Sequence, residues 1–200
     1  MGGPATMFGG VIWLLAWVHF LLTHGPTTSD YKETFLGLSY YDSTKLTVFA
    51  IALCMVGIVS LWTRRPAEVQ TWTWTLGHFL AVSALSVMSA GLVVSVWSVP
   101  WGETTRVSTT LTDYAFVTMM IASIFAFVGL TLLGIGVVRT KVLPAWTVAP
   151  LAIAGFAAVP WIHHTLYGVF IGLGWLTVGY ALLRPGYLRS ARGRPLTPAC

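Results

Sequence analysis

The sequence feature that most limits the fold is a run of 42 residues, 142–183, that contains no aspartate, glutamate, lysine or arginine. A helix rises about 1.5 Å per residue, so a single helix of this length would measure about 63 Å, twice the roughly 30 Å of a bilayer's hydrocarbon core. The run must therefore reverse direction. Proline interrupts helices, so Pro160 and the polar stretch His163–Thr165 are the predicted reversal point.

The rest of the chain is apolar enough to need the same lipid environment. Of its 200 residues, 56% are hydrophobic and 8% are charged, whereas a soluble domain has roughly 25% charged residues. Backbone within lipid must satisfy its own hydrogen bonds, which leaves helices or a closed barrel. Barrel strands alternate apolar and polar residues over about ten positions, but the apolar runs here are continuous and longer. We predict an all-α, multi-pass protein of the plasma membrane, in direct contact with the lipid bilayer.

Six apolar runs predict a six-transmembrane-helix bundle that forms a single membrane domain over residues 1–200. The predicted spans are 7–22, 46–62, 74–97, 114–138, 145–159 and 166–183. Residues 184–200 are predicted to be a basic, flexible cytoplasmic tail, attracted to anionic lipid.

The distribution of basic residues predicts the orientation, because loops rich in lysine and arginine stay in the cytoplasm. Eight basic residues fall on one side of the predicted bundle: Arg64, Arg65, Arg139, Lys141, Arg184, Arg189, Arg192 and Arg194. Three fall on the other: Lys32, Lys45 and Arg106. Both termini are therefore predicted to be cytoplasmic. The net charge of +5 is spread over helix ends rather than gathered in one patch, so nucleic acid is not a predicted partner.

Four of the five histidines are predicted to lie near the outer surface. His19 lies a little over one turn before the end of the first span, His24 lies at that end, and His163 and His164 precede the last span. Neutral imidazole binds zinc, copper or haem iron and transfers protons. With the carboxylate of Asp113 at the start of the fourth span, the predicted site residues are His19, His163, His164 and Asp113.

Each of these residues also has a structural interpretation. Histidine is comfortable at a lipid–water boundary, and Asp113 suits a helix N-cap or a first-turn acid. His19 is harder to explain in this way, because a polar ring within an apolar span needs a partner. On a helix His19 and His24 lie about 140° apart, and His163 and His164 about 100° apart, so at most one of each pair faces inward.

These observations predict a protein that binds, or acts on, a lipophilic small molecule at its outer end. A haem- or metal-bearing subunit, a structural subunit of a membrane complex and a small transporter remain as alternatives. No cofactor is assigned, and whether the protein is an enzyme stays open. Glycine-rich faces, such as Gly168 and Gly172, predict close packing within the chain and could also support homo- or hetero-oligomers. His78, in the third span, is predicted to have an interfacial or packing role.

Overall fold

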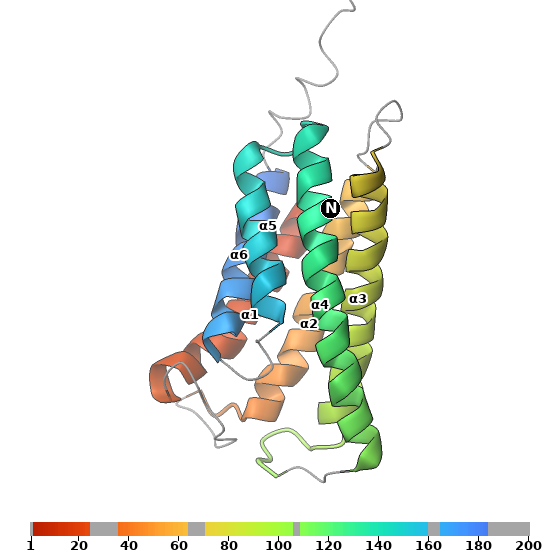
Figure 1. Ribbon diagram of the computed structural model, residues 1–200. Coiled ribbons are helices and arrows are strands. Elements are labelled where there is room, and N and C mark those ends of the chain that lie inside the picture. The colour runs from red at the N-terminus through yellow and green to blue at the C-terminus, as the bar shows by residue number, and fades with distance from the viewer. Residues whose placement is uncertain (1, 25–35, 64–70, 106–108, 160–164, 184–200) are drawn as a thin grey trace, which may run out of the picture.

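Six α-helices account for most of the chain that the computed structural model describes, which is residues 2–24, 36–63, 71–105, 109–159 and 165–183 (Figure 1). The elements are α1 (Gly2–His24), α2 (Tyr40–Thr63), α3 (Trp72–Val96), α4 (Thr110–Arg139), the 3₁₀ turn η1 (Ala145–Thr147), α5 (Val148–Ala158) and α6 (Thr165–Leu183). Five of them, α1 to α4 and α6, are long and apolar enough to cross a membrane. The predicted all-α, multi-pass architecture is confirmed.

The fifth predicted span is present but short. Helix α5 has 11 residues, which rise about 17 Å and do not reach across a hydrocarbon core of roughly 30 Å. Pro150 lies in its first turn, where a proline costs no intrahelical hydrogen bond. Figure 1 shows α5 ending, and α6 beginning, short of the bundle end that α3 and α4 reach. By length, five of the helices are long enough to cross a membrane and α5 is not.

The helices form a closed ring in which each packs against its neighbours in the chain and α6 packs back against α1. A Cβ added at Gly3, near the start of α1, would lie 3.1 Å from the backbone of Leu182 near the end of α6. The two ends of the helical region therefore meet at one end of the bundle. We call this the His78 end, and the opposite end, where α1 and α3 finish and α2 and α4 begin, the His19 end.

Glycines let two antiparallel helix pairs approach to backbone contact. In the α3–α4 pair the facing residues are Gly77 with Leu133, Ala81 with Gly129, and Trp74 with Gly136. In the α1–α6 pair they are Gly10 with Leu176, Leu14 with Gly172, and Met7 with Gly179. The three contacts follow one another at the same residue spacing along the helices of both pairs. A Cβ at any of these glycines would come within 2.3–2.8 Å of the facing helix. Small residues allow such close approach between membrane helices, so the predicted intramolecular use of Gly172 is confirmed.

Large aromatic side chains lie inside the bundle, while other apolar residues face outward. Trp13, Trp17, Trp74 and Trp175 are at most 1% exposed. Phe8, Phe79 and Phe125 are among the many large apolar side chains that are exposed. An exposed apolar surface of this extent is suited to lipid rather than to water.

Candidate functional site at the His19 end

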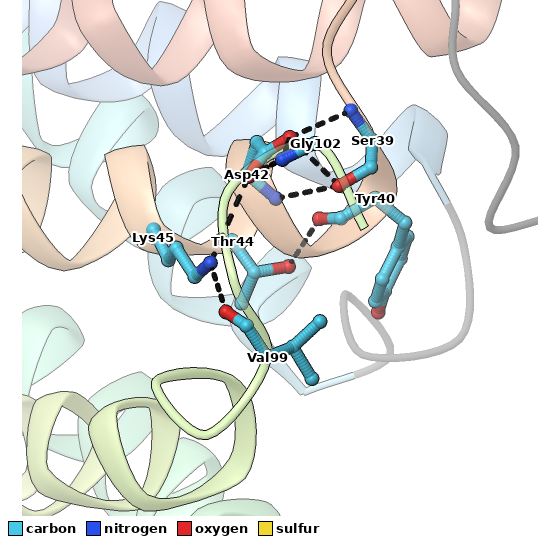
Figure 2. Close-up of polar contacts among 7 residues, drawn as sticks. All are labelled: Ser39, Tyr40, Asp42, Thr44, Lys45, Val99 and Gly102. Carbon is cyan, nitrogen blue, oxygen red and sulfur yellow. Dashed lines mark hydrogen bonds and ion pairs between the residues drawn. The ribbon is translucent and has the colours of Figure 1, made fainter. Parts of the chain in front are cut away.

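Helix α2 begins six residues before the predicted start of its span, because of a reciprocal cap between Ser39 and Asp42 (Figure 2). The backbone N–H of Asp42 donates to Ser39 Oγ (3.2 Å), and the backbone N–H of Ser39 donates to Asp42 Oδ2 (3.1 Å). The Ser39 hydroxyl also donates to Oδ2 (2.8 Å). This capping box supplies partners for N–H groups that the first helical turn leaves unpaired.

The same carboxylate fixes the loop between α3 and α4 to the start of α2. The backbone N–H of Gly102 donates to Asp42 Oδ2 (2.9 Å). Lys45 Nζ lies 3.7 Å from Asp42 Oδ1, donates to the carbonyl oxygen of Val99, and lies 4.7 Å from the centre of the Trp101 ring. We call this set of contacts the loop clamp, and Figure 2 shows all of it except Trp101. Gly102 has φ of +82°, which glycine adopts at little cost.

The loop clamp corrects the predicted start of the second span at residue 46, which placed Asp42 and Lys45 in the preceding loop. Instead both lie within α2, and both side chains are 2% exposed. A buried ion pair is tolerated when further hydrogen bonds satisfy both partners, as they do here. The Asp42 oxygens are occupied by these structural contacts, so the site cannot draw on this carboxylate.

His19 is fully buried in α1, and its two ring nitrogens contact different helices. The Nδ1 atom lies 2.8 Å from the carbonyl oxygen of Leu15. A carbonyl only accepts, so Nδ1 carries a proton in this hydrogen bond. The Nε2 atom lies 3.4 Å from the hydroxyl oxygen of Ser43 on α2, and the centres of the His19 and Phe20 rings are 4.6 Å apart. The second ring nitrogen of His19 therefore faces the neighbouring helix.

The burial of His19 does not follow from the helical pattern of α1. Phe8, Leu15 and Leu22 fall within about 60° of His19 around the helix, and all three are more than half exposed. Sequence periodicity alone would place the ring towards lipid. The expectation that an imidazole within the span needs a partner is met by Leu15 and Ser43.

A polar seam continues from Ser43 along the contact between α1 and α2. The Trp17 Nε1–H donates to Thr47 Oγ1 (2.9 Å), and the Thr47 hydroxyl donates to the carbonyl oxygen of Ser43 (2.9 Å). All three residues are buried. This seam was not predicted from the sequence, although Ser43 and Thr47 lie four residues apart and therefore share a helical face.

The remaining predicted site residues are not gathered around His19 in the described part of the chain. Asp113 is exposed in the first turn of α4, after the N-cap Thr109, whose hydroxyl accepts from the backbone N–H of Thr112. This position matches the alternative that made Asp113 a first-turn acid. Helix α4 packs against α3 and α5, whereas α1 packs against α2 and α6. His163 and His164 lie outside the described residues.

Within the described ranges, no group of three or more histidine, cysteine, aspartate or glutamate side chains is placed to hold a metal ion. The site is therefore a buried histidine beside the hydroxyl of Ser43, which follows directly after the Asp42 that holds the α3–α4 loop. Comparison with known proteins gave no matching family model, no similar curated protein and no similar solved structure.

Proposed function

We propose that this multi-pass membrane protein binds a lipophilic small molecule at the His19 end, with Nε2 of His19 as the polar contact. The observation that carries the proposal is a fully buried imidazole in a membrane-crossing helix, whose Nε2 atom lies 3.4 Å from the hydroxyl oxygen of Ser43. At 3.4 Å this contact is near the limit of hydrogen bonding. A hydroxyl group on a ligand can therefore compete with Ser43 for Nε2.

The packing of α1 against α6 supports a role for one of the adjacent histidines. Gly10 faces Leu176 and Leu14 faces Gly172, and continuing this antiparallel register brings Thr165 level with Leu21. Thr165 is the first residue of α6 and follows His164 in the chain. We therefore propose His163 or His164 as the second polar contact to the ligand. The proposal does not require Asp113, because α4 is not packed against α1.

The test is to identify what co-purifies with the protein. Full-length wild type and the variants His19→Gln, His163→Gln and His164→Gln are purified in the same detergent, extracted with organic solvent and compared by mass spectrometry. We expect one lipophilic compound to be bound by wild type and depleted about tenfold in His19→Gln, which is the effect of one lost hydrogen bond.

His24→Gln is the matched control, because helical spacing places His24 on a different face of α1. It should retain the compound at the wild-type level. Equal amounts of every extracted compound in wild type and His19→Gln would rule out the proposed site. A Soret band, or a stoichiometric metal in the wild-type sample, would instead favour the haem- or metal-bearing subunit.

A further inference from the structure

Two buried ring nitrogens of α3, near the His78 end, have no hydrogen-bond partner among the residues that the structure describes. They are Nε1 of Trp74, whose side chain is fully buried, and Nδ1 of His78, which is 9% exposed. The residues lie four apart in α3, on successive turns and about 40° apart around the helix. Buried polar groups almost always have partners, because an unpaired group in apolar surroundings is costly. A bound ligand that supplied a polar atom to this pair would remove that cost.

Aromatic rings line the surroundings of His78. The Trp62 ring of α2 lies 4.7 Å from the His78 ring, with 34° between their planes. The Phe79 ring lies 5.9 Å from that of Trp62. Phe79 and Trp72 are exposed on the bundle surface, where the hydrocarbon of a bilayer would contact them. The aromatic cluster around His78 therefore extends to the surface that would face lipid.

We propose that Trp74 and His78 bind a lipophilic molecule that carries a carbonyl oxygen on a flat unsaturated ring, the chemistry of membrane quinones. The Trp74 Nε1–H can only donate, so the ligand must offer an acceptor. A carbonyl oxygen has two lone pairs, so it can accept from Trp74 Nε1 and also from His78 in the tautomer that carries its proton on Nδ1. Both donors belong to neutral side chains, which suits a neutral carbonyl better than a carboxylate. The flat ring gains by stacking near Trp62.

Trp74 and His78 lie in the first two turns of α3, at the His78 end of the bundle, whereas His19 lies near the end of α1, at the opposite end of the bundle. This site is therefore separate from the one proposed at the His19 end. The two proposals therefore fail or succeed independently. Binding at the His78 end involves no electron transfer or covalent step.

The test uses decylubiquinone as the probe and the full-length protein in detergent. Isothermal titration calorimetry compares wild type with Trp74→Phe and His78→Phe, each of which removes one donor and keeps an aromatic ring. We expect saturable binding by wild type and a dissociation constant about tenfold higher in each variant. Trp72→Phe is the matched control, because Trp72 lies in the same turn but is exposed, and its dissociation constant should stay within about twofold of wild type.

Two results would overturn the proposal. One is wild-type binding no tighter than that of decylbenzene, which has the chain and the flat ring but lacks the carbonyl oxygens. The other is equal binding by wild type and His78→Phe. If Trp74→Phe does not fold, His78→Phe alone decides between these outcomes. The rise in melting temperature on adding the probe is measured on the same samples, and it should be smaller in His78→Phe than in wild type and Trp72→Phe.

Discussion

Replacing Asp42 by alanine should destabilise the bundle strongly, because this carboxylate serves three donors and one cation. The change removes the reciprocal cap with Ser39, which is worth about 1 kcal/mol. It also leaves the Gly102 N–H without its acceptor and the buried Lys45 ammonium without its counter-ion. Removing one partner of a buried ion pair typically costs 3–5 kcal/mol. Since these losses overlap, we expect about 3–5 kcal/mol in total.

Lys45→Met should cost less, about 1–2 kcal/mol. In that variant Asp42 still accepts from the N–H and hydroxyl of Ser39 and from the N–H of Gly102. The double variant should be more stable than the sum of the two single changes predicts, by about 1–3 kcal/mol, because the two residues share one interaction. The asymmetry between the two single variants is the distinguishing result.

The measurement is reversible unfolding in mixed micelles of increasing denaturing detergent, followed by tryptophan fluorescence. Asp113→Ala is the matched control, since it removes an exposed aspartate from the first turn of another helix and should stay within about 0.5 kcal/mol of wild type. A Lys45→Met variant less stable than Asp42→Ala would refute the reasoning. So would an Asp42→Ala variant as stable as the control.

Three further predictions test the packing and the orientation. Trp17→Phe and Thr47→Val should each cost about 1 kcal/mol of unfolding free energy, and the double variant should cost no more than either; additive losses would show that no hydrogen bond joins them. Gly172→Leu should cost about 3 kcal/mol in the same assay, because its Cβ would lie 2.8 Å from Leu14; wild-type stability would contradict the close α1–α6 contact. In a chain without its native cysteines, Glu103→Cys and Lys141→Cys should react with a membrane-impermeant thiol reagent from opposite sides of intact vesicles, with residue 103 outside. Labelling of both from one side would contradict a crossing by α4.

The helical bundle could be predicted from sequence because apolar length decides whether a segment enters lipid. The uncharged run of residues 142–183 contains α5 and α6, as its length required. The helix starts were less predictable. The charges of Asp42 and Lys45 indicated a loop, but the Ser39 cap and the ion pair let both residues enter α2. The pattern Ser-x-x-Asp ahead of an apolar run was the available signal.

The contacts of the candidate site were less predictable from the sequence than the helices. The sequence indicated that His19 needed a partner, because it lies inside an apolar span. It could not identify Ser43, which is on another helix and depends on how α1 and α2 align. Nor could it indicate that Trp74 and His78 have ring nitrogens without a hydrogen-bond partner in the described part of the chain, since such a group is a property of the assembled interior.

The contact between the first and last helices has a consequence for biosynthesis. Gly10 of α1 packs against Leu176 of α6, and Leu14 against Gly172. Ribosomes add about 5–20 residues per second, so α1 waits roughly 10–30 s in the nascent chain before α6 exists. Throughout that interval the glycine-lined side of α1 is open to other helices in the bilayer. Correct assembly of the nascent chain therefore requires that its own α6 pack against this side of α1 before a helix of another protein does.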